Sequence, residues 1–419
     1  MSGNTKKGPL VPQLRFPEFR NAGEWTHAPL GRLFSERQEA GFTNLPLLSL
    51  MDKEGIVPQE ETNRKNNSSE NKSKYLRVLP GDIAYNTMRM WEGRSAYVGL
   101  EGLISPAYTV CVPAEGISSS FFSYHFKTTS LIRQFKKYSQ GLVKDTLNLK
   151  FEAFSRIEIP YPSEAREQQK IAECLSSLDE MIAAETRKLD ILKSHKKGLM
   201  QLIFPHEGET VPQLRFPEFR DEGGWEFDLL GNIFDTTSGG TPSRSVKEYW
   251  NGCIPWITTS LVDFGIITRA DEFISEVGLK NSAAKIFPRG TVLIAMYGQG
   301  KTRGQVALLS IEAATNQACA AILPRKEIDP NFVFLNLASR YEEMRQLSNS
   351  GGQENLSQSL IRELPFSYPS NPAEQRMITT FLTSIDNVID AQAQRIESLK
   401  SHKNGLMQQL FPVLGETSA

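Results

Sequence analysis

The chain has 419 residues, of which 39% are hydrophobic and 23% charged, a composition typical of soluble globular proteins. This length allows two or more domains, each with its own core. The formal net charge of −1 neither requires nor excludes a nucleic-acid partner, because acidic surfaces can offset a local basic one. No apolar run approaches the roughly 20 residues of a membrane-spanning helix. The four cysteines lie far apart in the sequence, a pattern that fits reduced thiols in a cytoplasmic protein. We therefore expect a cytoplasmic protein without membrane association.

An internal repeat divides the chain into two equivalent parts. The decapeptide Val-Pro-Gln-Leu-Arg-Phe-Pro-Glu-Phe-Arg occupies residues 11–20 and returns unchanged at residues 211–220. Segments of different sequence follow the two copies, and matching residues then reappear at Tyr161-Pro162 and Tyr368-Pro369. We expect this order along the chain: an N-terminal connector at 1–20, a first variable domain at 21–160, a central spacer helix at 161–205, a connector at 206–220, a second variable domain at 221–367, a distal spacer helix at 368–412 and a C-terminal tail at 413–419.

Apolar runs bounded by turn-forming residues predict four short strands and one helix in each variable domain. In the first domain the strands are expected near Leu45–Met51, Ile83–Asn86, Ala96–Val98 and Tyr108–Val112, and the helix near Phe121–Tyr138. In the second domain the strands are expected near Pro255–Thr259, Thr291–Ala295, Gln305–Leu309 and Cys319–Ile322, and the helix near Asn331–Leu347, ending at Gly351-Gly352.

Two long heptad patterns predict the spacer helices. Apolar residues recur at alternating spacings of four and three, which is the a/d pattern of a coiled-coil seam. Both seams become polar at equivalent places, Glu185 with Lys196 and Gln392 with Lys403, which are 207 positions apart. The seam positions expected to pack are Leu175, Leu178, Ile182, Leu189 and Leu192 in the first helix, and Leu382, Ile385, Ile389, Ile396 and Leu399 in the second.

The repeat also predicts how the two helices are oriented. The second variable domain is compact, so the distal helix, which starts at Asn371-Pro372 with Glu374 three residues on, begins near the end of the central helix. We therefore expect the helices to pair as an antiparallel coiled coil. Gly208-Glu-Thr210 precedes the second decapeptide, and Gly415-Glu-Thr417 follows the distal helix. The expected fold class is α+β, with two globular domains alternating with two long helices in a circularly permuted, pseudo-twofold repeat.

This organisation resembles the specificity subunit of a type I restriction-modification enzyme. The resemblance rests on the repeated Pro-Gln-Leu-Arg-Phe-Pro-Glu-Phe segment, the circular permutation and a Glu-Gln pair at the start of each long helix. Further similarity to target recognition domains lies in short motifs: Gly239-Gly-Thr-Pro-Ser243, Tyr249-Trp250, Ile254-Pro-Trp256, Pro80-Gly-Asp-Ile83 and Ser105-Pro-Ala-Tyr108.

The resemblance implies a function in DNA recognition. Each variable domain would be a target recognition domain that reads one half of a bipartite, asymmetric sequence in double-stranded DNA. The helices would set the gap between the halves and bind two methyltransferase (modification) subunits, which hold S-adenosylmethionine. Restriction/translocase subunits, which use ATP and Mg, would join the complex. The chain itself would need no cofactor or metal and would not be an enzyme.

Residues that could contact DNA are expected on loops of the variable domains. Arg, Lys, Asn, Gln, Ser and Thr match the donors and acceptors of base edges, and Lys and Arg also neutralise phosphate. The candidates in the first domain are Asn86, Arg89, Trp91, Arg94, Ser105, Tyr108 and Lys144. Those in the second domain are Thr241, Ser243, Thr259, Tyr297, Lys301, Arg303, Asn316 and Gln317.

Two other functions are compatible with parts of the sequence. The stretch from Ala295 to Thr302 fits a relaxed phosphate-loop pattern centred on Lys301, which would indicate an NTPase. No helix is expected after it, and a glycine-rich basic loop facing DNA is the preferred interpretation. The other alternative is a coiled-coil scaffold whose end domains bind proteins and not DNA.

Overall fold

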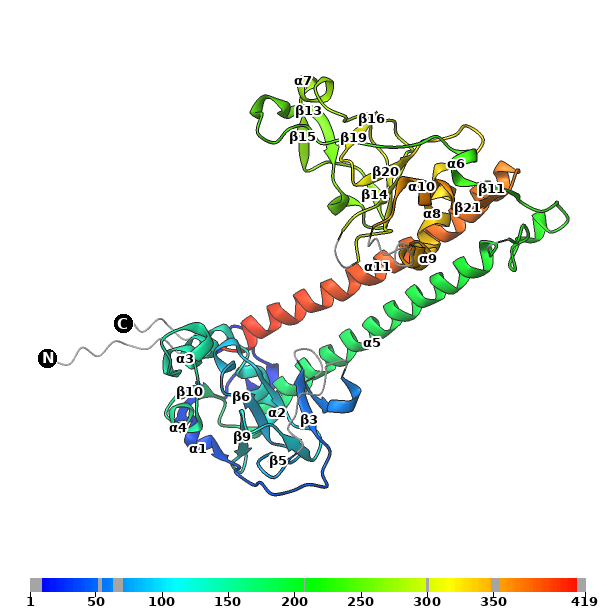
Figure 1. The fold of residues 1–419 in the computed structure, drawn as a ribbon. Coiled ribbons are helices and arrows are strands. Elements are labelled where there is room, and N and C mark those ends of the chain that lie inside the picture. Colours follow the sequence, from blue (N-terminus) through cyan, green and yellow to red (C-terminus); the bar gives the residue numbers. More distant parts are fainter. Residues whose placement is uncertain are drawn as a thin grey trace. The chain divides into compact units, whose positions relative to one another are not determined.

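The computed structural model describes residues 10–51, 55–62, 71–206, 208–298, 301–347 and 355–412. The chain divides into two compact units (Figure 1): unit 1 contains residues 1–186 and 394–419, and unit 2 contains residues 187–393. The long helices α5 (Ala165–Ile203) and α11 (Pro372–Leu410) each contribute residues to both units. None of the described helices is long and apolar enough to cross a membrane.

Unit 1 contains the first variable domain. Its strands are β1 (Thr26–Pro29), β2 (Phe34–Glu36), β3 (Leu48–Met51), β4 (Gly55–Pro58), β5 (Leu76–Val78), β6 (Ile83–Asn86), β7 (Ser95–Tyr97), β8 (Gly102–Ile104), β9 (Tyr108–Pro113) and β10 (Glu158–Tyr161). Its short helices are α1 (Leu30–Leu33), α2 (Ser119–His125), α3 (Thr129–Tyr138) and α4 (Phe151–Ser155).

Unit 2 contains the second variable domain. Its strands are β11 (Glu226–Leu229), β12 (Thr236–Ser238), β13 (Trp250–Ile257), β14 (Ile266–Ile267), β15 (Glu272–Ile274), β16 (Ile286–Phe287), β17 (Val292–Ala295), β18 (Val306–Leu309), β19 (Ala313–Thr315), β20 (Cys319–Ile322) and β21 (Pro365–Tyr368). Its short helices are α6 (Leu230–Ile233), α7 (Glu276–Lys280), α8 (Pro330–Ser339), α9 (Tyr341–Leu347) and α10 (Gln358–Arg362).

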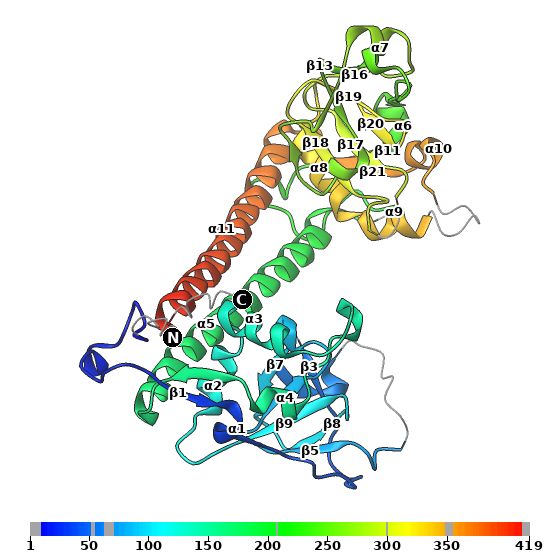
Figure 2. The ribbon, with the colours of Figure 1, turned by 90° about the vertical axis from the view of Figure 1, so that its left-hand side faces the viewer.

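The central sheets of the two variable domains have the same strand order. The sheet of unit 1 runs β2-β9-β6-β7, and that of unit 2 runs β12-β20-β17-β18 with β14 added at the edge. In β6, Ile83 and Tyr85 belong to the hydrophobic core that contains Phe121 and Phe122 of α2, whereas Ala84 packs with residues of β3 and β4. This alternation follows from the two-residue period of a strand. Figure 2 shows α2 and β3 flanking this sheet in unit 1. The two variable domains therefore share a sheet topology although their sequences have little in common.

The predicted strands are largely confirmed, and the predicted helices are broken. Strands β6 and β20 have the expected bounds, but β13 ends at Ile257, before the expected Thr259. The expected helix Phe121–Tyr138 is two helices, α2 and α3, because Thr128 is extended and its hydroxyl donates to His125 O at 2.7 Å. Helices α8 and α9 likewise replace the single helix expected at Asn331–Leu347, with the break at Arg340. The glycine pair expected to end that helix lies outside the described residues.

The start of α11 is capped in part as expected. Asn371 Oδ1 accepts from Ala373 N at 2.9 Å, and Pro372 is the first helical residue. Glu374 does not turn back to complete a capping box. Its carboxylate instead accepts from Arg215 Nε and Nη2, both at 2.8 Å, and from the Trp225 indole at 3.1 Å. The second decapeptide is therefore fastened to the start of α11.

In each unit, the connector binds the end of a long helix in the same way. In unit 2, Leu214 N donates to Leu202 O at 2.9 Å, just before α5 ends. In unit 1, Leu14 N donates to Gln409 O, also at 2.9 Å, just before α11 ends. The N-terminal decapeptide therefore contacts the C-terminal end of α11 in the same way as the second decapeptide contacts the C-terminal end of α5. This contact is the structural counterpart of the circularly permuted repeat.

The heptad positions of both helices are protected from solvent. Every predicted seam position on α5 and α11 is buried or half-buried. The polar seam residues form ion pairs within their own unit: Lys196 with Asp386 in unit 2, and Lys403 with Asp179 in unit 1. Glu185, also a seam residue, pairs with Arg395 in unit 1 at 2.9 Å. In unit 1 the two helices are antiparallel where they meet, because Asp179 and then Glu185 along α5 pair with Lys403 and then Arg395 along α11, in order of falling residue number.

Candidate nucleic-acid interface

In unit 1, a junction of three backbone segments forms where β6 ends. Thr87, the next residue, donates its N–H to Ala107 O at 3.1 Å, in the turn before β9. Leu149 N donates to Thr87 O at 2.8 Å. The ladder between β6 and β9 pairs Asn86 with Tyr108 at the same end of the sheet. Three of the DNA-contact candidates, Asn86, Ser105 and Tyr108, are therefore brought together here.

Unit 2 has an equivalent junction at the end of β17. Met296 N donates to Ala318 O at 2.8 Å, and Leu356 N donates to Met296 O at 3.0 Å. The ladder pairs Ala295 with Cys319, as Asn86 pairs with Tyr108 in unit 1. Asn316-Gln-Ala-Cys319 therefore stands where Ser105-Pro-Ala-Tyr108 stands in the first domain. Sequence comparison alone did not reveal this correspondence, because the two segments share only one residue.

The turn at residues 315–318 gathers further loops in unit 2. Gly240 N donates to Thr315 O at 2.9 Å, and Asn316 N donates to Ile257 O at 3.0 Å. The Thr241 hydroxyl donates to Gln317 Oε1 at 2.5 Å. These bonds place Thr241, Asn316 and Gln317 on adjoining loops. Thr259 and Tyr297 lie close by in sequence, since Thr259 is two residues after Ile257 and Tyr297 follows Met296. The side chains of Thr241, Tyr297 and Gln317 are exposed.

Gly239 allows the closest approach in this junction. A Cβ atom built on Gly239 would lie 2.0 Å from Thr315 O. Only a residue without a side chain fits there, so the Gly-Gly-Thr-Pro-Ser motif can pass directly over the end of β19. The next residue, Gly240, is similarly close to Ala283. The motif thus positions its polar residues against the 315–318 turn.

The remaining candidates of unit 2 lie on neighbouring loops. The carbonyl of Ser243 accepts from the Trp250 indole at 3.1 Å, and its hydroxyl lies 2.8 Å from that of Ser245. Lys301 is exposed, and its carbonyl accepts from the Tyr341 hydroxyl at 2.6 Å. Arg303 is half-buried. Lys301 therefore offers an exposed side chain to phosphate, whereas the side chain of Arg303 is partly enclosed.

The candidates of unit 1 differ in what they can offer to DNA. Trp91 is 9% exposed and its indole donates to Met88 O at 2.9 Å, so it supports the loop after β6 and offers little surface to a base. Lys144 Nζ lies 5.6 Å from the centre of the Trp91 ring and is exposed. Arg89 is exposed and pairs with Glu92 at 3.3 Å, and Arg94 is half-buried. Asn86 and Ser105 use their side-chain oxygens to accept local backbone N–H groups.

Sequence reasoning missed Arg244 in unit 2. Its guanidinium lies 3.7 Å from the centre of the Trp250 ring and 5.0 Å from that of Trp256, and it also contacts Glu272. The side chain is 56% exposed. A cation held by stacking beside the Gly-Gly-Thr-Pro-Ser motif is preorganised for phosphate. The sequence contained a sign of this site, since Arg244 directly follows that motif and two tryptophans occur within the 12 residues after Arg244.

The geometry excludes the phosphate-loop interpretation of Lys301. A phosphate loop joins a strand to a helix whose N-terminus faces the phosphates. Here the segment connects the antiparallel strands β17 and β18, and residues 301–305 contain no helix. Lys301 therefore lies in a β-hairpin connection.

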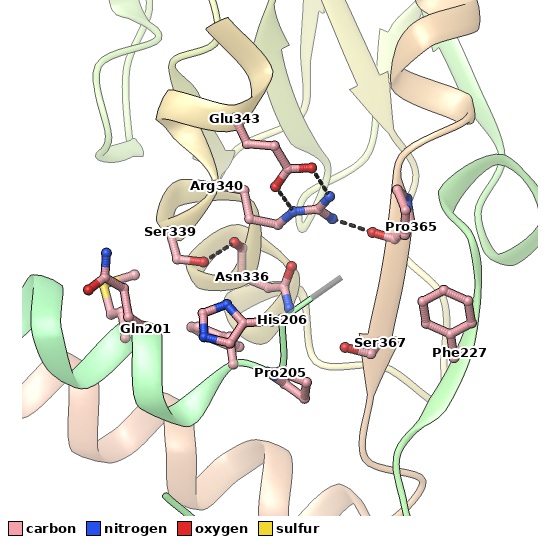
Figure 3. A pocket seen from close by; sticks show the side chains of 12 residues that line it. Gln201, Pro205, His206, Phe227, Asn336, Ser339, Arg340, Glu343, Pro365 and Ser367 are labelled. Atoms are coloured by element: carbon pink, nitrogen blue, oxygen red, sulfur yellow. Dashed lines mark hydrogen bonds and ion pairs between the residues drawn. The ribbon is translucent and has the colours of Figure 1, made fainter. Parts of the chain in front are cut away.

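A cavity of about 210 Å³ lies in unit 2 beside the end of α5 (Figure 3). Arg340 lies at its wall and is bound to Glu343 and to the carbonyl of Pro365, as Figure 3 shows. Its charge is thus already compensated. Within the described part of the chain, no group of three or more His, Cys, Asp or Glu residues could hold a metal ion.

Comparison with known families identifies the chain. Residues 57–194 and 222–401 match the type I restriction modification DNA specificity domain, and the chain belongs to this family. It is accordingly a non-catalytic DNA-recognition subunit of the type I restriction-modification class. The two matched segments contain most of the two variable domains and of the two long helices, which confirms the internal repeat.

Individual relatives are similar over most of the chain. The MjaVIII specificity subunit of Methanocaldococcus jannaschii is 24% identical over 356 residues, covering 81% of this chain and 82% of the relative. The HindI specificity subunit of Haemophilus influenzae is 25% identical over 384 residues, covering 75% and 83%. The MjaIX specificity subunit, also from M. jannaschii, is 29% identical, but the match spans only 41% of that relative.

Solved structures share the fold. A chain from a structural study of complex assembly and conformational transition in a type I restriction-modification system has a TM-score of 0.63 at 16% identity, covering 93% of this chain and 97% of that one. The S subunit from M. genitalium has a TM-score of 0.55, also at 16% identity, covering 96% and 99%.

Proposed function

We propose that each variable domain reads one half of a bipartite, asymmetric sequence in double-stranded DNA. The observation that supports this most strongly is the pair of equivalent junctions, at Thr87 and Ala107 in unit 1 and at Met296 and Ala318 in unit 2. Each junction joins loops that carry polar side chains, and the side chains differ between the domains. Two similar frames with different contact residues are what two unlike half-sites require.

The chemistry of the junctions suggests a division of roles. Thr241, Asn316 and Gln317 carry hydroxyl and amide groups that suit base edges. Lys144, Arg244 and Lys301 carry exposed cations that suit phosphate. Phosphate contacts would position each domain on the duplex, and the polar groups of the loop ends would discriminate between bases.

We further propose that α5 and α11 pair as an antiparallel coiled coil that fixes the number of base pairs between the half-sites. The protected seam positions and the ion pairs within each unit support this. Two equivalent helix surfaces would suit two methyltransferase subunits, which would hold S-adenosylmethionine. Restriction/translocase subunits, with ATP and Mg, would complete the assembly in the cytoplasm.

The test is an exchange of one domain. Residues 221–367 are replaced by the corresponding domain of a relative with a different target, and methyladenine is mapped in DNA modified by the assembled complex. One half of the methylated sequence should change and the other should stay. If both halves or neither half change, the proposal of one domain for one half fails. A complex that contains methyltransferase subunits but binds DNA without sequence selectivity would favour the scaffold alternative.

A further inference from the structure

Phe264 in unit 2 combines a strained backbone with an exposed aromatic ring. Its φ angle is 52°, in the left-handed region that a bulky side chain rarely adopts. The residue is 40% exposed, so burial recovers only part of the hydrophobic stabilisation that a phenylalanine can give. A glycine would take the same backbone conformation without strain. Folding alone therefore does not account for this phenylalanine, and strained residues of this kind cluster at functional sites.

The surrounding structure holds Phe264 in place. Its N–H donates to Val306 O at 2.9 Å, and Leu308 N donates to the carbonyl of the next residue, Gly265, at 3.1 Å. The Phe264 ring packs edge to face on Tyr341 of α9, with the ring centres 5.0 Å apart and an angle of 85° between the ring planes. Backbone hydrogen bonds and an aromatic contact therefore fix the ring while part of it stays open to solvent.

Phe264 lies at the same end of the central sheet as the junction of unit 2. Strand β17 ends at Ala295, just before that junction, and its antiparallel neighbour β18 begins there at Val306. Strand β14 runs parallel to β18, so Phe264, two residues before β14, lies where β18 begins. The loop that carries Tyr297 and Lys301 extends from this same end of the sheet. The ring is therefore continuous with the proposed DNA-reading surface.

Cations flank the aromatic contact. The Tyr341 hydroxyl donates to the carbonyl of Lys301 at 2.6 Å and accepts from Arg345 Nη1 at 2.8 Å. The Arg345 guanidinium also lies 5.5 Å from the centre of the Tyr341 ring, and the side chain of Lys301 is exposed. The carboxylate of Asp263, one residue before the exposed ring, accepts from the Gln305 amide at 2.6 Å. Aromatic rings among cations that can bind phosphate are typical of nucleic-acid-binding surfaces.

We propose that Phe264 is an apolar wedge that inserts between two base pairs of the second half-site. This inference rests on the proposed function, in which unit 2 reads that half-site. An inserted apolar side chain partly unstacks one base step and kinks the duplex, and the bend brings more of the DNA against the protein. The cost is lowest at pyrimidine–purine steps, which unstack easily. Phe264 therefore favours a flexible step without hydrogen bonds to its bases. In the part of unit 1 that the structure describes, no strand corresponds to β14, so the unstacked step is expected in the second half-site only.

The experiment uses the full chain assembled with its methyltransferase subunits and duplexes that contain its mapped target. The fluorescent base 2-aminopurine is placed at successive purine positions of both half-sites, because its fluorescence rises when it is unstacked. In the wild type, a rise is expected at one step of the second half-site. Phe264→Gly should abolish this rise and weaken DNA binding about tenfold, and Phe264→Tyr, which keeps the ring, should retain both. A rise from a base flipped out by the methyltransferase stays in every variant and is thereby distinguished.

Phe273→Ala and Asn251→Gly are the matched controls. Phe273 is an aromatic residue of unit 2 with the same 40% exposure, on β15 of the other sheet. Asn251 is exposed and also has a positive φ angle, of 60°. Neither substitution should change the affinity for DNA or the fluorescence. Thermal unfolding checks that each variant is folded. If Phe264→Gly does not fold, Phe264→Asn, which also tolerates the left-handed conformation, is judged by the same criteria.

The outcomes separate this inference from the proposed function. If the wild-type complex methylates no bipartite sequence, the proposed function fails. If the wild type binds its target and the folded Phe264→Gly variant keeps both the affinity and the fluorescence rise, only the wedge is overturned. Weaker binding with unchanged fluorescence also overturns it, because the ring would then contact DNA whose bases stay stacked. Loss of a subunit from the complex with unchanged fluorescence would assign the ring to a protein contact instead.

Discussion

The guanidinium of Arg15 and the carboxylate of Glu167 form two hydrogen bonds, of 2.8 and 2.7 Å, across 152 residues of chain. Both side chains are almost fully buried, and the Trp25 indole also donates to Glu167 at 3.3 Å. The hydrogen bond to Glu167 raises the pKa of Arg15. Unit 2 repeats the arrangement with Arg215, Trp225 and Glu374. In each unit, the arginine of the decapeptide therefore binds the glutamate of the Glu-Gln pair at the start of the long helix.

Removing the carboxylate of this contact should destabilise unit 2 strongly. Glu374→Ala leaves the buried Arg215 cation without a partner and the Trp225 indole without an acceptor. We expect a loss of about 3–5 kcal/mol in the free energy of unfolding, measured by denaturant titration. Glu218→Ala, at an exposed glutamate of the same decapeptide, is the control and should change stability by less than about 0.5 kcal/mol. Similar losses in both variants would contradict a special role for Glu374.

His125 should make the stability of unit 1 depend on pH. Burial among Trp25, Phe121 and Phe411 lowers the pKa of His125 to about 3. The folded state therefore stays neutral while the unfolded state binds a proton below about pH 6.5. Stability should fall as pH decreases through this value, by about 2 kcal/mol between pH 7 and pH 5. His125→Phe should remove this part of the dependence in thermal unfolding, whereas His195→Ala, on an exposed histidine of α5, should not. A dependence of the same size in His125→Phe would refute the assignment.

A methyl group at Gly239 should disturb the second recognition site. The Cβ of Gly239→Ala would lie 2.0 Å from Thr315 O, so the loop must move away from Thr315, and we expect this shift to disturb the nearby hydrogen bond from Thr241 to Gln317. We expect a loss of about 1–3 kcal/mol in stability and weaker selectivity for the second half-site only. Gly265→Ala is the control, because its nearest atom would be Asp263 O at 3.7 Å. Unchanged selectivity in a folded Gly239→Ala variant would place base reading elsewhere.

Lys301 should act on affinity without regard to sequence. If its exposed side chain neutralises one phosphate, Lys301→Ala should weaken binding to all targets and reduce the salt dependence of the binding constant by about one counterion. Fluorescence anisotropy at several salt concentrations measures both effects. Lys326→Ala, beyond the other end of β20, should leave the slope as it is. An unchanged slope for a folded Lys301→Ala variant removes this residue from the interface.

Lengthening one helix should lengthen the gap. Half-sites read from one face of the duplex lie about one helical turn apart, about 10 base pairs centre to centre, which leaves a gap of roughly six to eight base pairs. Four residues inserted after Leu189 extend α5 by about 6 Å and add about 40° of rotation. The same bases should be read with a gap longer by one or two base pairs, as mapped by methyladenine sequencing. An active variant with the original gap would rule out the helices as the determinant of spacing.

The periodic and repeated features of this protein could be predicted from its amino-acid sequence. Heptad spacing is a local property, so α5 and α11 could be predicted to within a few residues. The bounds of β6 and β20 followed from short apolar runs between turn formers. The repeated decapeptide and the resemblance to specificity subunits predicted the two-domain frame, and the family match confirmed it.

The contacts between residues far apart in the sequence could not be predicted and depend on the tertiary fold. The junction of Met296, Ala318 and Leu356 depends on backbone hydrogen bonds between segments far apart in the chain, and no local pattern encodes such bonds. The same holds for Lys196 with Asp386, since the heptad pattern places Lys196 in the seam but does not show which carboxylate it contacts. The break at Thr128 likewise overrode a continuous helical pattern, because α2 and α3 pack their aromatic residues on one core. Side chains acquire their function here from long-range packing, which composition and periodicity do not contain.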